Sequence, residues 1–187
     1  EILPYLSDPK APSMMMAADA IPETYRHPIS YFKPAFGLHL LREYILGKDR
    51  FDYAFKRYIH NWAFKHPSPE DFFHTMDNES GEDLTWFWRE WFINNWSLDQ
   101  AVQQVSLSGN TATITITNLN KMVMPVVIQL TFNNGTTQRL QLPVETWFQH
   151  TTYTLSVPVS AAITTVTIDP DHMLPDANRQ NNVWKAQ

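Results

Sequence analysis

Histidine is the residue type in this chain best suited to bind a catalytic metal ion. The seven histidines are His27, His39, His60, His66, His74, His150 and His172. In a helical metal-binding motif two histidines stand four residues apart, with a glutamate directly after the first, so that both rings reach one ion. No histidine here is followed by glutamate, and no two are four residues apart. We interpret them as surface or core residues and expect no metal site within this chain.

Clustered carboxylates offer a second possible chemistry, either acid–base catalysis or calcium binding. Glu70-Asp71 and Glu82-Asp83 stand where helices are expected to begin, and acids at that position cap helices. The run Asp169, Asp171, Asp176 and Asn178 suggests a calcium loop. However, Met173 occupies the third ligand position, and the required Gly and Glu do not follow. We interpret the pairs as helix caps and the run as a structural turn.

Other catalytic signatures are also missing from the sequence. The chain has no cysteine and five glycines, and it contains neither a Gly-x-Ser-x-Gly turn nor a phosphate-binding glycine loop. The net charge is -5 with no basic stripe, which argues against nucleic acid as a partner. No apolar run is long enough for a membrane segment. We expect the chain to catalyse nothing when isolated.

Composition divides the chain into two parts. Residues 1–100 hold 15 acidic and 10 basic residues, whereas 101–187 hold four of each and are rich in Thr and Val. We place the boundary so that one domain spans 1–97 and the other 98–187. Because the chain starts at Glu1 and shows no leader pattern, we expect it to be a fragment.

Helical periodicity dominates the first part after residue 29. Five prolines before that point predict an extended segment. A helix is expected from Ser30 with Pro34 in its first turn, a second after a cap at Asp49, and a third from Ser68. A fourth follows Ser80 and carries the aromatic stripe of Phe87, Trp88, Trp91 and Phe92.

The second part alternates with a period of two. The expected strands are 102–107, 112–116, 126–132, 140–142, 153–157 and 163–168. Turns are expected at Ser108-Gly109-Asn110 and at Asn133-Asn134-Gly135. Six or seven short strands with such turns predict an antiparallel β-sandwich of immunoglobulin-like type. The fold class is therefore α+β multidomain, with a helical subdomain followed by a sandwich.

Several segments of the first part resemble one peptidase family in order. They begin with Ile29-Ser30-Tyr31-Phe32-Lys33-Pro34-Ala35 and continue through Leu46-Gly47, Phe64-Lys65-His66-Pro67, Asp71-Phe72-Phe73, Ser80-Gly81-Glu82-Asp83-Leu84 and Trp86-Phe87-Trp88. In this order they are similar to the aminopeptidase N and leukotriene hydrolase family of zinc peptidases (gluzincins), just downstream of its metal-binding motif. The resemblance implies that the helical part is the C-terminal part of a thermolysin-like catalytic domain.

The resemblance assigns one catalytic residue to this chain. The tyrosine two residues before the lysine, here Tyr31, donates a hydrogen bond to the oxyanion formed during peptide hydrolysis. Zinc in the intact enzyme would be held by an upstream domain of the same chain, through two histidines and a glutamate, with a general-base glutamate beside them. None of these ligands lies in this fragment. The substrate would be a peptide that loses its N-terminal residue.

Two positions depart from the family pattern. The family usually has glycine where this chain has Pro34, which stiffens the helix entry. The leukotriene hydrolase branch has a second tyrosine at the position of Arg26, so epoxide hydrolysis is not expected. The Lys33-Pro34-Ala35 variant resembles bacterial members and suggests the periplasm or cell surface. A non-catalytic docking or scaffold module and an inactive family member remain the alternatives.

Overall fold

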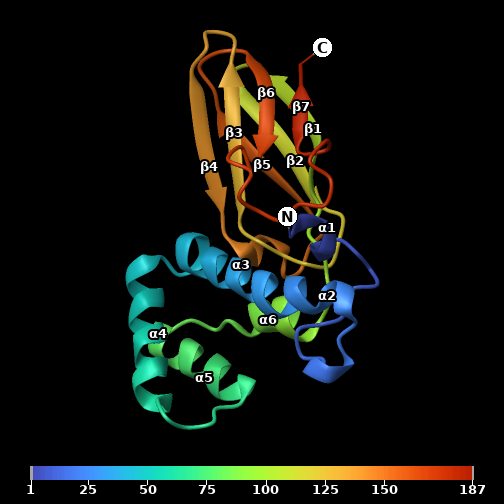
Figure 1. Cartoon of the computed structure of the whole chain (residues 1–187). Helices are drawn as coiled ribbons and strands as arrows, with labels where there is room; N and C mark the ends of the chain where they lie inside the picture. Colours follow the sequence, from blue (N-terminus) through green and yellow to red (C-terminus); the bar gives the residue numbers. More distant parts are fainter. Residues whose placement is uncertain (1, 187) are drawn as a thin grey trace. The chain divides into compact units, whose positions relative to one another are not determined.

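The computed structural model describes residues 2–186 and divides between Asn95 and Trp96 into two compact units. This division lies close to the boundary placed after residue 97 from composition. The first unit is built from helices and the second from β-strands (Figure 1). Among residues 2–186, no helix is long and apolar enough to cross a membrane.

Short helical segments with tight and wide turns between them make up the first unit. Its α-helices are α1 (Leu3–Leu6), α2 (Glu23–His27), α3 (Lys33–Leu40), α4 (Lys48–Trp62), α5 (Pro69–Ser80) and α6 (Thr85–Trp88). Its other turns are the 3-10 turn η1 (Ala18–Ala20) and the π-helical turns η2 (Pro28–Phe32), η3 (Leu41–Ile45) and η4 (Arg89–Ile93).

Helix α5 shows how local sequence sets the helix ends. The Ser68 hydroxyl accepts a hydrogen bond from the Asp71 N–H at 3.2 Å, and the Asp71 carboxylate accepts one from the Ser68 N–H at 2.8 Å. Pro69 fills the first helical position, where no N–H is needed. Gly81 ends the helix in the left-handed conformation, with φ at 66°. The sequence prediction for this helix start is confirmed.

Aromatic rings join α4, α5 and α6. The Phe72 ring meets Tyr58 edge-on at 4.9 Å between ring centroids, and Phe73 stacks on Trp88 at 4.7 Å. The Trp88 indole N–H also donates to the Asp77 carboxylate at 2.8 Å. These contacts bury the apolar stripe expected after Ser80.

Pro34 lies in the first turn of α3, as expected, although helical backbone already begins at Glu23. Two other expectations for the first unit are wrong in detail. Residues 1–29 are not simply extended, because the short helices α1 and α2 form between the prolines. Asp49 lies inside α4 and is not its cap. The cap position is occupied by Gly47, whose φ of 81° is a conformation that favours glycine.

The π-helical turn η2 accommodates Pro34 within a continuous helical path. A proline in a regular helix removes one N–H and crowds the carbonyl four residues earlier. Here the Lys33 N–H reaches back five residues to the Pro28 carbonyl, which widens the turn just before the proline. Such single π turns occur frequently at functional sites, and this one contains Tyr31.

The second unit consists of two antiparallel sheets around one core (Figure 1). Its strands are β1 (Gln100–Ser108), β2 (Thr111–Asn118), β3 (Val126–Phe132), β4 (Thr137–Leu142), β5 (Thr152–Pro158), β6 (Ile163–Ile168) and β7 (Val183–Lys185). A 3-10 turn, η5 (Val144–Trp147), links β4 to β5. The sheet orders are β1-β2-β5 and β4-β3-β6-β7.

Alternation along the strands builds this core. Ile114 and Ile116 of β2 face Ile128 and Leu130 of β3 in a single buried cluster, while the residues between them are more exposed. Both predicted hairpin turns are present, joining β1 to β2 and β3 to β4. The prediction of a helical part followed by packed antiparallel sheets is therefore confirmed.

Candidate active site

Tyr31 projects from η2 toward solvent. Its side chain is 63% exposed, which is high for an aromatic residue, whereas Ile29 in the same turn is 1% exposed and anchors it in the core. The Tyr31 ring stacks on His27, one turn earlier, at 5.6 Å between ring centroids. Local packing therefore leaves its phenol group available to a ligand. A phenol stays a hydrogen-bond donor at neutral pH and can stabilise an oxyanion.

A hollow of about 560 Å³ lies beside this turn. It is lined by Pro4, Tyr5, Glu23, Thr24, His27, Pro28 and Phe32. Tyr31 itself does not line the hollow, but it stacks on His27, which does. The walls are mostly aromatic and proline carbon, with one carboxylate and one imidazole, as in pockets that receive small organic groups.

The N-terminal segment is tied down on one side of the hollow. Tyr5 meets Tyr25 edge-on at 6.3 Å between ring centroids, and the Tyr25 hydroxyl donates to the Asp8 carboxylate at 2.7 Å. The Asn95 amide donates to the Asp8 carbonyl at 3.0 Å. Hydrogen bonds from the Lys10 N–H and from the Tyr25 hydroxyl lower the pKa of Asp8. The bond between Tyr25 and Asp8 also raises the pKa of Tyr25. These contacts fix the wall that Tyr5 contributes.

Lys33 is a residue of this region that reasoning from the sequence missed. The sequence analysis used it only to locate Tyr31, yet its side chain is 1% exposed. Among residues 2–186, the Lys33 ammonium has no hydrogen-bond partner. Burial lowers the pKa of this ammonium to about 8. Its spacing from Ile29 and Gly37, four residues away on either side and both buried, was a usable signal of a lysine in an apolar stripe.

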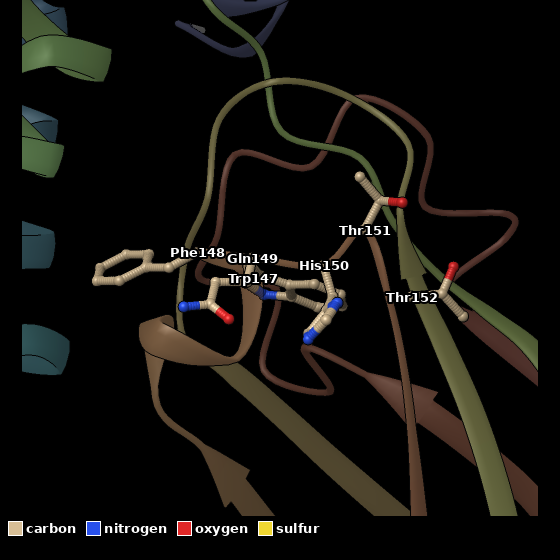
Figure 2. Close-up of a pocket in the computed structure, with 6 residues that line it drawn as sticks. All are labelled: Trp147, Phe148, Gln149, His150, Thr151 and Thr152. Atoms are coloured by element: carbon tan, nitrogen blue, oxygen red, sulfur yellow. The ribbon is translucent and has the colours of Figure 1, made fainter.

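A second hollow, of about 550 Å³, lies in the strand unit and is lined by the consecutive residues Trp147 to Thr152 (Figure 2). The indole N–H of Trp147 is already used, since it donates to the Met124 carbonyl at 3.0 Å. Figure 2 shows the Phe148 side chain pointing away from Thr152. These residues bring no set of acid, base and nucleophile together, so the hollow has no evident catalytic use.

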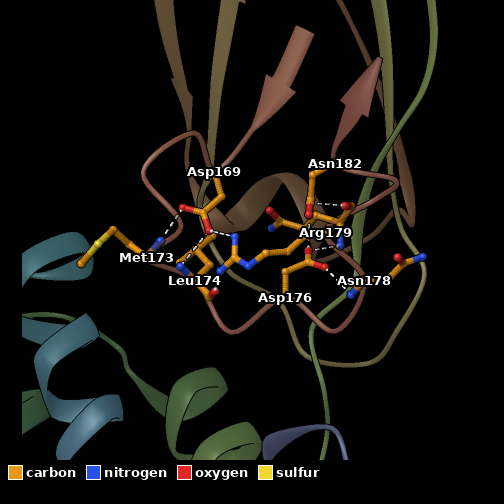
Figure 3. A network of polar contacts seen from close by, with 8 residues as sticks. Asp169, Met173, Leu174, Asp176, Asn178, Arg179 and Asn182 are labelled. Atoms are coloured by element: carbon orange, nitrogen blue, oxygen red, sulfur yellow. Dashed lines mark hydrogen bonds and ion pairs between the residues drawn. The ribbon is translucent and has the colours of Figure 1, made fainter. Parts of the chain in front are cut away.

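The aspartate run near the C-terminus serves structure (Figure 3). Asp169 accepts hydrogen bonds from the N–H groups of Met173 and Leu174, both at 2.9 Å, and pairs with Arg179 at 3.0 Å. The φ of Asp169 is 48°, a turn conformation that these bonds hold in place. The carboxylate oxygens of Asp169 are thus occupied by N–H donors of the same segment, as expected for a structural turn.

Histidine, aspartate and glutamate side chains are the candidates for metal binding in the described part of the chain. Within residues 2–186, no group of three or more such side chains lies close enough together to hold a metal ion.

Comparison with known proteins bears on the helical unit most directly. Residues 8–91 match the model of the peptidase family M1 domain, and this range contains Tyr31, Lys33 and most of the hollow. The match confirms the resemblance to the aminopeptidase N and leukotriene hydrolase family over these residues. Among curated protein sequences, none matches the chain.

A solved structure supports the fold. Aminopeptidase A of Legionella pneumophila, in complex with aspartic acid, is similar over 81% of this chain, with a TM-score of 0.61 and 18% sequence identity. The chain spans 18% of the length of that protein. At this identity the likeness concerns the fold alone.

Proposed function

We propose, from the match of residues 8–91 to a segment of a peptidase M1 domain, that this chain is the C-terminal portion of a zinc-dependent aminopeptidase. In this proposal the helical unit completes a thermolysin-like catalytic domain, and the strand unit is an immunoglobulin-like domain that follows it. The substrate is a peptide that loses its N-terminal residue. The chain is inactive alone, because another part of the polypeptide supplies the metal ligands.

Tyr31 is the catalytic residue of the proposal. Its 63% exposure beside a hollow is the observation that carries this role, because a core tyrosine would have its ring enclosed. The phenol O–H donates to the oxygen of the scissile carbonyl as negative charge develops there. The bond strengthens only as that charge grows, so it stabilises the transition state more than the bound peptide.

Replacement of the phenol oxygen in the longer protein tests this role. Tyr31→Phe should lower kcat by about 10²–10³-fold, the usual effect of removing one oxyanion donor, and zinc content should stay the same. Tyr53→Phe is a matched control, because Tyr53 is similarly exposed, at 56%, but lies on α4. Turnover by Tyr31→Phe equal to that of the unaltered protein would refute the proposed role.

The alternatives are a docking module and a family member that has lost its metal ligands. The sequence encoded directly before Glu1 separates them from the enzyme. A His-Glu-x-x-His motif followed by a further glutamate supports the aminopeptidase, because those residues would supply the ligands that residues 2–186 lack. A parent protein without that motif contradicts catalysis and favours one of the alternatives.

A further inference from the structure

The outer strands of the two sheets differ in how well their free edges are protected. An outer strand leaves a row of backbone N–H and C=O groups unpaired, and proteins normally protect such a row with charge, proline, a bulge or short length. Within residues 2–186 the outer strands are β1, β4, β5 and β7. Three of these strands carry such a protection, and β5 lacks one along most of its length.

The protections of β1, β4 and β7 are of three kinds. A bulge interrupts β1 between Val102 and Gln104, and the Val102 N–H already donates to the Asn181 carbonyl at 3.0 Å. Strand β4 carries the charged side chain of Arg139. Strand β7 has three residues and ends with Lys185. Each of these features discourages the addition of a further strand.

Strand β5 is regular and uncharged. It pairs with β2 in one continuous register, without the shift found in β1. Residues 152–157 include neither a charged residue nor a proline, and Pro158 ends the strand. Because no part of residues 2–186 pairs with its other side, a flat run of six residues is open to a further strand.

The outward backbone groups of β5 belong to Thr152, Thr154 and Ser156. In an antiparallel pair, alternate residues bond to the neighbouring strand, and the residues between them point to the other side. The Val159 N–H donates to the Asn110 carbonyl at 2.8 Å, so the odd-numbered residues of this segment bond to the β2 side. The even-numbered residues therefore direct their N–H and C=O groups away from the sheet.

The core-facing side of β5 is also incompletely covered. Tyr153 is 37% exposed and Leu155 is partly exposed, whereas Ile116 and Ile114, which lie opposite them on β2, are fully buried. The side chains of one more strand beside β5 would cover these two residues. The edge thus offers a partner both unpaired backbone groups and apolar surface.

We propose that β5 pairs antiparallel with β5 of a second copy of this chain, in a register centred on Thr154. Thr154 then lies opposite its own copy and Thr152 lies opposite Ser156 of the second copy, so every outward group finds a partner. On the core-facing side, Tyr153 lies opposite Leu155 of the second copy, and aromatic–aliphatic cross-strand pairs are stabilising.

The sequence of β5 meets the requirement of a twofold contact, in which one surface must be complementary to itself. No like charges meet across the axis, because residues 152–157 are uncharged. A contact limited to one strand of each copy is small compared with the roughly 1,200–2,000 Å² of stable interfaces. We therefore expect a reversible dimer that forms as concentration rises, and this dimer does not depend on the proposed peptidase activity.

Analytical ultracentrifugation of the longer protein at concentrations up to the submillimolar range tests the dimer. The unaltered protein should shift from monomer to dimer as its concentration rises. Thr154→Lys should raise the dissociation constant by about tenfold or more, because two ammonium groups would meet at the axis. Ser106→Lys is the matched control, since Ser106 is exposed on β1, at the far edge of the same sheet, and it should leave the constant unchanged.

Two outcomes would overturn the proposal. A protein that stays monomeric throughout would mean that another domain or another protein covers β5. Equal dissociation constants for Thr154→Lys and Ser106→Lys would place the dimer contact elsewhere.

Thr154→Pro repeats the test without adding charge. It removes the outward N–H of Thr154, while the hydrogen bonds to β2 remain because the odd-numbered residues make them. The dimer should be lost, and the far-UV circular dichroism should match that of the unaltered protein. A dimer retained by this variant would contradict pairing through β5.

Cross-linking tests the register. Residues 1–187 contain no cysteine, so a single thiol can be placed at will in this chain. Facing residues in a hydrogen-bonded pair lie about 5.5 Å apart between Cα atoms, which a disulfide can span. Oxidation by diamide should therefore convert Thr154→Cys to a covalent dimer and leave Ser106→Cys largely monomeric under the same conditions. Equal yields from the two variants would overturn a register centred on Thr154.

Discussion

Lys33, a buried charge of the helical unit, differs in its surroundings from two buried charges of the strand unit. In the strand unit, Asp169 and Asp176 are 4% and 6% exposed, and each carboxylate accepts three hydrogen bonds or ion-pair contacts from nearby groups. In the helical unit, Lys33 is 1% exposed and its ammonium has no partner within residues 2–186. The two buried carboxylates of the strand unit are paired, whereas the buried ammonium of Lys33 is not paired within residues 2–186.

A buried polar group without a partner calls for an explanation, such as strain, a catalytic role, or a bound water or ion. The strand unit also has buried amide oxygens that find no partner among residues 2–186, at Gln100, Asn118, Asn181 and Asn182, but these groups are neutral and less costly to bury than a charge. Lys33, whose ammonium has no hydrogen-bond partner within residues 2–186, follows Tyr31 by two residues in the sequence.

The largest effect on stability is expected from replacing Asp176, a buried carboxylate of the strand unit. Asp176→Ala removes the acceptor for the N–H groups of Gln100 and Asn178 and for the Asn182 amide. We expect a loss of roughly 4 kcal/mol in the free energy of unfolding, because each buried donor left unpaired costs about 1–3 kcal/mol. Urea unfolding followed by tryptophan fluorescence measures it.

Asp171→Ala is the control for that substitution. Asp171 also forms an ion pair, with Arg139 at 2.7 Å, but both side chains are 51% exposed. The unfolding midpoint should therefore change little. If the two substitutions have equal effects, burial of the Asp176 network does not stabilise the strand unit as the comparison requires.

Lys33 should give the 187-residue chain an unusual dependence of stability on pH. Its pKa is about 8 in the folded chain and 10.5 in the unfolded chain, so between these values the unfolded state binds more protons. Stability therefore rises as pH increases from 8 to 10.5. The difference between the two pKa values corresponds to about 3 kcal/mol. Unfolding by urea across this pH range measures the change.

Lys33→Met isolates the contribution of this one group. The variant should be more stable than the unaltered chain at pH 7, because it removes a buried unpaired charge, and the rise between pH 8 and 10.5 should vanish. Tyrosines and other lysines titrate in the same range, so the difference between the two proteins is the relevant quantity. An identical pH dependence in both would remove the contrast between the two units.

Local sequence rules predicted the regular elements well. Ser68, Pro69 and Gly81 marked the two ends of α5, and alternation with turn residues located β1 to β6, whereas the short strand β7 was not predicted. These signals work because caps and hairpin turns depend on a few adjacent residues. The short helices α1 and α2 were missed, because prolines were interpreted as breaks although Pro4 and Pro22 lie at helix starts.

The candidate site was harder to predict from the sequence. Tyr31 was found only through family resemblance, since a single tyrosine has no local pattern. The π turn η2 was not foreseen, because bonds that reach back five residues have no distinct residue signature, and Pro34 was a hint of it only in retrospect. The hollow depends on residues far apart in sequence, such as Tyr5 and Phe32, which only the folded chain brings together.

The smallest effect is expected from removing the helix cap at Ser68, on the surface of the helical unit. Ser68 is exposed and exchanges two short-range hydrogen bonds with Asp71 at the start of α5. Ser68→Ala should lower the free energy of unfolding by about 1 kcal/mol, the usual loss for such a cap. Urea unfolding followed by far-UV circular dichroism measures it.

Asn78→Ala is the matched control, since Asn78 is exposed inside the same helix and makes no side-chain hydrogen bond among those found in residues 2–186. It should lose no stability, because alanine has the higher helix propensity. A loss at Ser68 comparable to that at Asp176 would mean that the helical unit depends on its surface caps as strongly as the strand unit depends on its buried carboxylates. In that case the contrast between the two units would concern Lys33 alone.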